Sequence, residues 1–256
     1  MIANYHTHTW RCMHAEGLEK RYVECAIEWG LKVLGFSDHT PMPYDEGYVS
    51  KVKMSMDQLE DYVNTVLKLK SEYSNDIEIH LGLEVEYYPK YFEKLIAITG
   101  QYPIEYFLLA QHFIGNEIGE PFSGERTDDP GRLIQYCLQA EEAIETGYFT
   151  YFAHPDLLYF VGDEKIYEQW MGRLCKCAKK KNIPLEINFL GLWDKRNYPD
   201  LRFWKIAGEI GNKVVFGSDA HQPEKVWNPE ALSMAEAIVH KYSLNVCDTV
   251  ELVTPV

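Results

Sequence analysis

The residues best suited to metal chemistry stand at the start of the chain. His6 and His8 follow a short apolar stretch, residues 2–5, and His14 comes shortly after them. Residues two apart on a strand point to the same side, so this spacing predicts that His6 and His8 present two imidazoles to one cation. An isolated His-x-His pair also occurs on ordinary surfaces, so the interpretation depends on what the rest of the chain adds.

Further candidate ligands stand at or near the ends of predicted strands. They are His39, Glu84, His112, His154, Asp219 and His221. Each histidine alone could be a core or capping residue, but their coincidence at strand ends predicts one shared site. Imidazole combined with carboxylate suits zinc, manganese or iron better than magnesium or calcium. Nine candidates exceed the three or four protein ligands of one catalytic zinc, so we predict two or three metal ions.

The elements that must position these residues alternate regularly along the chain. Strand patterns fall at 2–5, 33–36, 77–86, 106–110, 148–153, 183–187 and 213–216. Helical patterns fall at 16–30, 55–73, 93–99, 130–146, 164–181, 201–210 and 229–242. Apolar strands that alternate with helices predict a parallel sheet buried on both faces. We therefore predict an α/β fold, a distorted seven-stranded TIM-like barrel in one domain over residues 1–256, with the metal site at the C-terminal ends of the strands.

Composition narrows the class of protein. The formal net charge of −14 disfavours nucleic-acid binding, which needs a Lys/Arg-rich patch. The sequence has neither a long apolar segment nor a secretory signal pattern, so we expect a cytoplasmic protein that does not bind membranes. The six cysteines form no Cys-x-x-Cys pair and are expected to be reduced thiols. Composition leaves the oligomeric state open.

Some polar residues near the candidates have more than one possible role. Asp38 could be a ligand, a proton donor or a group that orients an imidazole, and strand alternation, which points it away from His39, favours the orienting role. Asp156 could act similarly or belong to a turn. His80 and His240 are left out of the site, the first as a hydrogen-bonded core residue and the second as a helix-end residue.

Taken together, these residues resemble the polymerase and histidinol phosphatase (PHP) superfamily over nearly the whole chain, and most closely its histidinol-phosphatase branch. The motifs are Tyr5-His6-Thr7-His8, Cys12-Met13-His14-Ala15-Glu16-Gly17, Ser37-Asp38-His39-Thr40-Pro41, Gly82-Leu83-Glu84, Leu185-Glu186-Ile187-Asn188 with Gly191, and Gly217-Ser218-Asp219-Ala220-His221. The resemblance implies a distorted seven-stranded barrel with three divalent metal ions.

The resemblance also implies how the ligands divide among the metals. By motif, one ion takes His6, His8, Glu84 and Asp219; a second shares Glu84 and takes His112 and His154; a third takes His14, His39 and His221. The chain departs from the branch at two places. It has Leu109-Ala110-Gln111-His112 where a Gly-Ser-Val-His segment is frequent, and it lacks an arginine between His154 and Tyr159. Arg196, near Tyr198-Pro199, matches the neighbourhood of the branch's other phosphate-binding arginine.

The resemblance implies hydrolysis of a small phosphorylated substrate, first of all L-histidinol phosphate, with Arg196 holding phosphoryl oxygens. A metal-bound water or Asp38 is the candidate to protonate the leaving group. The missing arginine keeps another small phosphate ester, such as a nucleotide or sugar phosphate, as the alternative. A C–N hydrolase is less favoured because no predicted strand ends in lysine, and a non-catalytic accessory module because the ligand set is complete.

Overall fold

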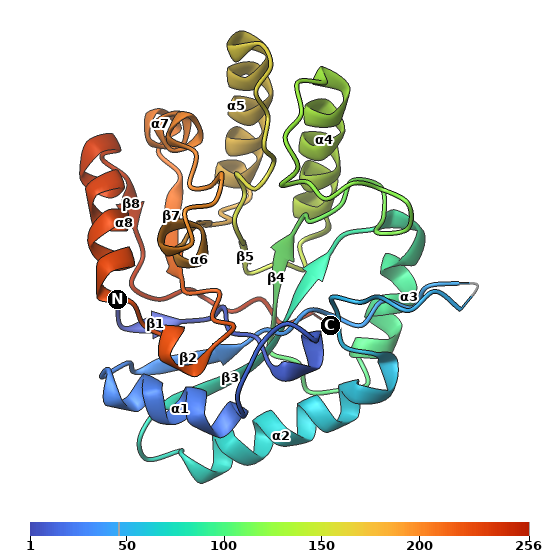
Figure 1. Ribbon diagram of the computed structural model, residues 1–256, viewed down its shortest axis with the longest axis vertical. Helices are drawn as coiled ribbons and strands as arrows, with labels where there is room; N and C mark the ends of the chain where they lie inside the picture. The colour runs from blue at the N-terminus through green and yellow to red at the C-terminus, as the bar shows by residue number, and fades with distance from the viewer. Residues whose placement is uncertain (46, 256) are drawn as a thin grey trace.

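The computed structural model describes residues 1–45 and 47–255 and has one curled parallel sheet (Figure 1). Its strands pair in the order of the sequence, β1 to β8. They are β1 Ala3–Asn4, β2 Val33–Phe36, β3 Glu78–Glu86, β4 Tyr106–Ala110, β5 Tyr151–Phe152, β6 Leu185–Asn188, β7 Lys213–Gly217 and β8 Asn245–Val246. The predicted α/β class is confirmed, whereas the predicted count of seven strands is wrong. The additional strand, β8, has two residues, too few to create a periodic pattern.

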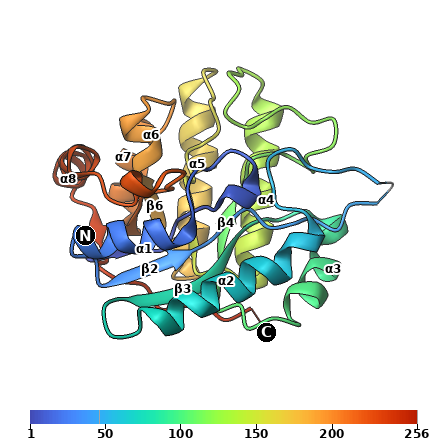
Figure 2. The ribbon, with the colours of Figure 1, turned by 60° about the horizontal axis from the view of Figure 1, so that its bottom comes forward.

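Helices lie around the outside of this sheet (Figures 1 and 2). They are α1 Glu19–Glu28, α2 Leu59–Glu72, α3 Pro89–Thr99, α4 Pro130–Thr146, α5 Glu164–Lys180, α6 Phe189–Trp193, α7 Leu201–Ile210 and α8 Pro229–Tyr242. Short 3-10 turns occupy Trp10–Cys12, Met56–Gln58 and Pro223–Lys225. Ser55 is the N-cap residue of the turn before α2, and Gly30 follows α1 with a left-handed φ of 79°. The five-residue helix α6 was not predicted, because it follows β6 directly.

Both faces of the sheet are buried, and consecutive strand residues enter different apolar clusters. Leu34 and Phe107 join helix residues in the main core, while their neighbours Val33 and Tyr106 join a smaller cluster with Tyr151. This alternation is the physical reason why the strands read as almost continuous apolar runs.

The chain beyond β1 meets the chain beyond β7. Thr7 and Ala220 form an isolated parallel bridge. The amide of His8 donates to the carbonyl of Ala220 at 3.0 Å, and the amide of Ala220 donates to the carbonyl of His6 at 3.3 Å. These bonds place the first histidine pair beside the last candidate ligands, although more than 200 residues separate them. At the other end of β7, β8 pairs with Lys213 and Val214.

No helix in the part of the chain that the structure describes is both long enough and apolar enough to cross a membrane.

Candidate metal centre

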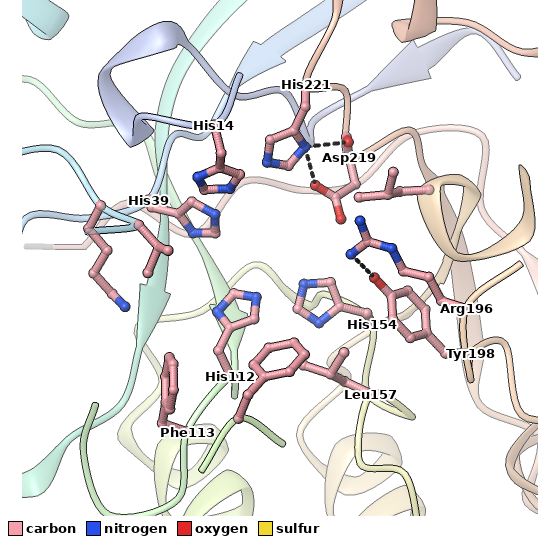
Figure 3. Close-up of a pocket in the computed structure, with 14 residues that line it drawn as sticks. His14, His39, His112, Phe113, His154, Leu157, Arg196, Tyr198, Asp219 and His221 are labelled. Carbon is pink, nitrogen blue, oxygen red and sulfur yellow. Dashed lines mark hydrogen bonds and ion pairs between the residues drawn. The ribbon is translucent and has the colours of Figure 1, made fainter. Parts of the chain in front are cut away.

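A pocket of about 580 Å³ opens at the C-terminal ends of the strands. Six of its lining residues are candidate ligands, and Figure 3 shows their side chains directed toward a common space: His14, His39, His112, His154, Asp219 and His221. The remaining lining residues are the cations Lys53 and Arg196, the phenol of Tyr198, and five apolar side chains, Val52, Phe113, Phe122, Leu157 and Leu190. The pocket thus joins a polar floor to an apolar wall.

The deepest candidates form a buried set that we call the inner group: His6, His8, Glu84, His154 and Asp219. Nε2 of His6 lies 3.3 Å from Oε1 of Glu84, and Nε2 of His154 lies 2.9 Å from the same oxygen. Nε2 of His8 lies 3.0 Å from Oδ1 of Asp219. Two carboxylates therefore face three imidazoles at distances that a shared cation could bridge.

A second set, the outer group, contains His14, His39 and His221. Their ligand atoms all lie within 4.8 Å of one another. Nδ1 of His39 also lies 2.7 Å from Oε2 of Glu84, so this glutamate borders both groups. His112 faces the other oxygen of Glu84, with its Nε2 3.7 Å from Oε1. The structure thus brings all nine predicted ligands into one region.

Oxygen acceptors behind the rings set the tautomers of five imidazoles. Nδ1 faces an oxygen at 2.7–3.3 Å in each case, namely His6 at Glu186, His8 at Asp38, His14 at the Cys12 carbonyl, His112 at Glu86 and His221 at the Asp219 carbonyl. Because a carboxylate or carbonyl oxygen only accepts, Nδ1 carries the hydrogen of the neutral ring, which leaves the lone pair on Nε2. Oxygen partners of this kind orient metal-binding histidines.

The surroundings of these Nε2 lone pairs show whether a metal cation suits the site. Within residues 1–45 and 47–255, the buried Nε2 atoms of His6, His8 and His221 have no hydrogen-bonding partner of acceptable geometry. A buried polar atom without a partner costs free energy, so several such atoms beside Glu84 and Asp219 need an explanation. Divalent transition-metal ions satisfy this donor set, because they take neutral imidazole and carboxylate together.

Two candidate ligands sit in a left-handed backbone conformation that is unusual for residues other than glycine. His154 has a φ of 31° and Asp219 a φ of 49°. Each follows a strand by two residues, at the point where the chain turns into a loop. Such conformations cost about 1–3 kcal/mol and persist where the surrounding structure holds them, frequently at functional sites. The backbone strain therefore coincides with the predicted site.

Sequence reasoning missed the role of Glu186. This fully buried carboxylate lies 2.8 Å from Nδ1 of His6 and accepts the amide hydrogen of His154 at 3.0 Å. It fits beside the sheet only because residue 217 is glycine: a Cβ there would come within 1.8 Å of Oε1 of Glu186. A carboxylate between Leu185 and Ile187 in a buried strand was the signal that could have revealed it, since buried charges are paired.

Glu86 was missed in the same way, although it shares strand parity with Glu84. Its Oε1 lies 2.7 Å from Nδ1 of His112, and its Oε2 lies 2.8 Å from Nζ of Lys53. Burial opposes ionisation of Glu86, but the Lys53 ammonium and His112 lower its pKa to about 2. Lys53 also contacts Glu117 at 2.7 Å, so a buried lysine links two long loops behind the pocket wall.

Electrostatics separates the inner from the outer group. Burial lowers the pKa of His8, but Asp219 and Asp38 outweigh it and raise that pKa to about 9. Burial lowers the pKa of His221 to about 3, with a further contribution from the charge on His8. Burial likewise holds the pKa of His39 well below its usual range. Imidazoles of the inner group therefore retain protons that those of the outer group lose.

Asp38 lies beneath the site rather than in the pocket. It is fully buried; Oδ1 contacts Nδ1 of His8 at 3.3 Å and accepts the amide hydrogen of His39 at 2.8 Å, while Oδ2 accepts from the hydroxyl of Thr9. This position suits orientation of His8. It does not suit delivery of a proton to a substrate, because both oxygens are engaged and His8 lies between Asp38 and Asp219.

Arg196 lines the pocket, as expected for a phosphate contact. Its Nε donates to Asp194 at 2.8 Å, and its Nη1 donates to the hydroxyl of Tyr198 at 3.3 Å. Figure 3 shows this pair on the side of Asp219 and His154. Burial raises the pKa of the Tyr198 phenol, and Asp219 raises it further, so the phenol keeps its proton.

The remaining sequence candidates lie outside the pocket. Asp156 is buried and accepts from the amide of Asp200 at 2.6 Å and from Nε1 of Trp204 at 2.9 Å. His80 contacts Glu105 at 3.1 Å. His240 lies in the last turn of α8.

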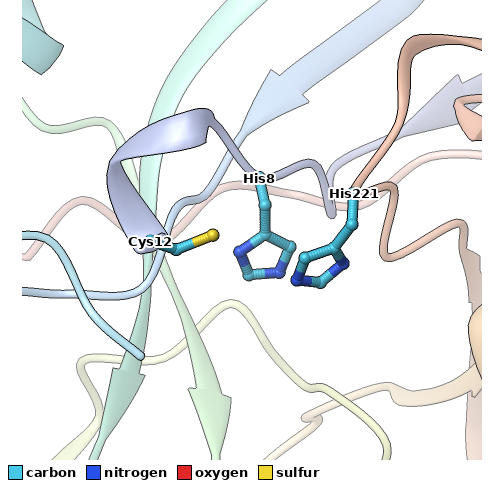
Figure 4. A group of neighbouring side chains, drawn as sticks. All are labelled: His8, Cys12 and His221. Carbon is cyan, nitrogen blue, oxygen red and sulfur yellow. The ribbon is translucent and has the colours of Figure 1, made fainter. Parts of the chain in front are cut away.

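Cys12 is an additional sulfur near the site. It forms a group with His8 and His221 whose potential ligand atoms lie within 4.8 Å of one another (Figure 4). Burial raises the pKa of its thiol, and Asp38 raises it further. A thiol that holds its proton is a poorer metal ligand than a neutral imidazole. All six cysteines are free, as predicted.

The sequence and the fold of this chain are similar to those of known proteins. The model of the PHP domain matches residues 4–189. A Deinococcus radiodurans protein named probable histidinol-phosphatase is 29% identical over 237 residues, which cover 88% of each chain. The histidinol-phosphatase of Bacillus subtilis is 28% identical over 249 residues, covering 85% of this chain and 92% of the relative. The crystal structure of Lactococcus lactis histidinol phosphate phosphatase with zinc, L-histidinol and phosphate has a TM-score of 0.77 at 18% identity, covering 98% of this chain and 97% of that one.

Proposed function

The chain belongs to the PHP domain family, and from that premise we propose that it is a metal-dependent phosphomonoesterase that hydrolyses L-histidinol phosphate to L-histidinol and phosphate. The observation that carries the proposal is the set of unpartnered imidazole nitrogens facing two buried carboxylates at the strand ends. The names of the curated relatives support the substrate. The Lactococcus protein of the same fold binds zinc, L-histidinol and phosphate together, which are the ligand types proposed here.

We propose three divalent transition-metal ions, zinc, manganese or iron. His6, His8, Glu84 and Asp219 would hold one ion, Glu84, His112 and His154 a second, and His14, His39 and His221 a third. One geometric group of potential ligands holds His6, His8 and Asp219 of the first set, and another holds all of the third set, which supports the division. His112 lies 3.7 Å from Glu84, the glutamate of the second set. When bound, such ions lower the pKa of water toward neutrality and polarise phosphoryl oxygens.

The chain's own residues then bind and orient the substrate. Arg196 presents a permanent positive charge to the phosphoryl oxygens from the pocket wall. Asp194 holds Nε of this guanidinium, which limits its motion. Asp38, Glu86 and Glu186 keep the histidines oriented from behind.

The apolar wall of the pocket offers space for the organic part of the ester. Phe113 and Phe122 are in an edge-to-face contact at 6.0 Å, and Leu157 lies in the same lining. A flat imidazole ring packs favourably against such surfaces. Leu157 belongs to the segment where the branch has an arginine, so the alternative of another small phosphate ester keeps a specific observation in its favour.

Phosphate release tests the proposal. The metal-loaded protein, reconstituted with Mn²⁺ or Zn²⁺, is assayed with L-histidinol phosphate, a nucleoside monophosphate and a sugar phosphate. The matched control is the double variant His6→Ala, His8→Ala. We expect selective turnover of L-histidinol phosphate that the control loses. Turnover of another ester in its place would refute the substrate, and no turnover of any ester by fully metallated protein would refute the phosphatase activity.

A further inference from the structure

The segment after His154 lacks the expected arginine, and Arg196 lines the pocket beside a second hydrogen-bonding group, the hydroxyl of Tyr198. Leu157 is the residue of that segment that lines the pocket, and Tyr159 is not part of the lining. We propose that the hydroxyl of Tyr198 donates a hydrogen bond to the phosphoryl group and so takes the place of the missing arginine. This inference rests on the proposed phosphatase function.

Tyr198 is placed to do this. It lines the pocket although only 3% of its surface is exposed, and its ring centroid lies 5.9 Å from that of His154. Figure 3 shows the phenol beside the Arg196 guanidinium, facing the space that the candidate ligands surround. The phosphoryl group of a bound ester must enter that space, so the phenol and the guanidinium approach it from the same side.

The hydrogen bond between Arg196 and Tyr198 leaves the phenolic proton of Tyr198 unused. Nη1 of Arg196 donates to the Tyr198 oxygen at 3.3 Å. A guanidinium has no acceptor, so the phenol cannot return its own proton to Arg196. Over residues 1–45 and 47–255 the structure gives this hydroxyl no acceptor. The proton therefore remains available for an oxygen in the pocket, while the bond from Arg196 polarises the phenol and strengthens it as a donor.

The absence of a side chain at Gly191 leaves space for the ring of Tyr198. A Cβ on residue 191 would lie 2.4 Å from Cδ2 of Tyr198, so Gly191 allows the ring its place. The amide of Gly191 donates to Oδ1 of Asn188 at 3.1 Å, and Nδ2 of the same asparagine donates to Asp219 at 3.1 Å. The end of β6 thus connects the support of Tyr198 to a proposed metal ligand. This contact accounts for two motif residues, Gly191 and Tyr198, that the metal site leaves unexplained.

The test is Tyr198→Phe in the metal-loaded protein, which removes the hydroxyl and keeps the ring. The matched control is Tyr167→Phe, since Tyr167 is equally buried and its hydroxyl bonds to Asp200 at 3.2 Å, away from the pocket lining. Three quantities are measured: kcat and KM for the best ester, the binding of inorganic phosphate by calorimetry, and the metal content per chain.

We expect Tyr198→Phe to lower kcat/KM by about 10- to 100-fold and to weaken phosphate binding, with metal content unchanged. Tyr167→Phe should leave all three quantities within about twofold of wild type. Wild-type kcat/KM and phosphate binding in Tyr198→Phe would overturn the inference. If the wild-type protein hydrolyses no ester, the proposed function fails separately, and phosphate binding alone still decides whether Tyr198 is a phosphate donor.

Discussion

The inner and outer groups of the site use the same side chain under opposite electrostatic conditions. In the inner group, His6 and His8 lie against Glu84 and Asp219, and the pKa values of both histidines are raised despite complete burial. In the outer group, His39 and His221 have lowered pKa values because burial dominates. The outer group has three imidazoles and only borders the carboxylates of the inner group: Nδ1 of His39 lies 2.7 Å from Oε2 of Glu84, and Nδ1 of His221 lies 3.4 Å from Oδ1 of Asp219.

This contrast predicts a difference in metal affinity. The inner group supplies negative charge in a buried place, where it attracts a cation strongly. It must first release protons, so its affinity should rise with pH. The outer group is already neutral and is open to solvent at His14, so its ion should exchange more readily. We therefore expect chelators to remove the outer ion first.

The largest effect that would test the comparison is expected for Glu84→Gln. Glu84 lies within 3.7 Å of a nitrogen of each of five histidines, namely His6, His8, His39, His112 and His154. Removing the negative charge of Glu84 should therefore weaken metal binding in both groups. We expect loss of bound metal and a fall in phosphate release of at least about 100-fold. Glu105→Gln is the control, because Glu105 contacts Lys70 outside the site. Full metal content in Glu84→Gln would contradict the shared role.

Glu186→Gln should affect the inner group alone. A glutamine has one acceptor oxygen, whereas Glu186 uses both of its oxygens, toward Nδ1 of His6 and the amide of His154. We expect about a 10- to 100-fold loss of metal affinity in the inner group, with the outer group unchanged. Metal titration monitored by calorimetry would show this. Equal weakening of both groups would mean that the division into two groups is wrong.

His14→Ala should affect the outer group alone. His14 contacts no carboxylate of the inner group, and its Nδ1 lies against the Cys12 carbonyl. We expect one bound ion fewer per chain and a fall in phosphate release of no more than about tenfold, or about 1.4 kcal/mol in barrier height. Elemental analysis of the variant beside wild type measures the loss. If His14→Ala released every ion, the inner group would not be the tighter site.

The smallest expected effect is on the pH dependence of stability without metal. The pKa of His8 is about 9 in the folded chain, above its ordinary 6.5, so its charge stabilises the fold fully below pH 6.5 and progressively less up to pH 9. His6 acts in the same direction. For protein from which a chelator has removed the metal, the free energy of unfolding should fall by about 2 kcal/mol between pH 6.5 and pH 9.

Urea unfolding at pH 6.5 and pH 9 measures this fall. The variant His8→Gln should reduce it, and wild-type protein saturated with metal should not show it, because bound metal requires neutral imidazole. A fall that is the same in His8→Gln and wild type would assign it to other groups.

The sequence was sufficient to locate the candidate ligands because eight of the nine stand near strand ends, while His14, in the loop after Trp10–Cys12, belongs to a family motif. His6 and His8 are two apart, and Glu84 lies two residues before the end of a recognisable strand, so parallel strands bring them to one edge. The metals and the division of ligands among them stay predictions.

Other features depend on distant contacts that no local pattern contains. Glu186 acquires its role from His6, 180 positions away, and Lys53 from Glu117, 64 positions away in another loop. The strand β8 is defined by pairing with Lys213 rather than by its own two residues. Local periodicity cannot reveal such partners, because they exist only after the chain has folded.

The most direct test of the whole account is phosphate release from L-histidinol phosphate as metal is returned to chelated protein. We expect no turnover without metal and a rise as the inner group fills, with a further increase as the outer group fills to three ions per chain. Full turnover by protein from which all metal has been removed would contradict the account.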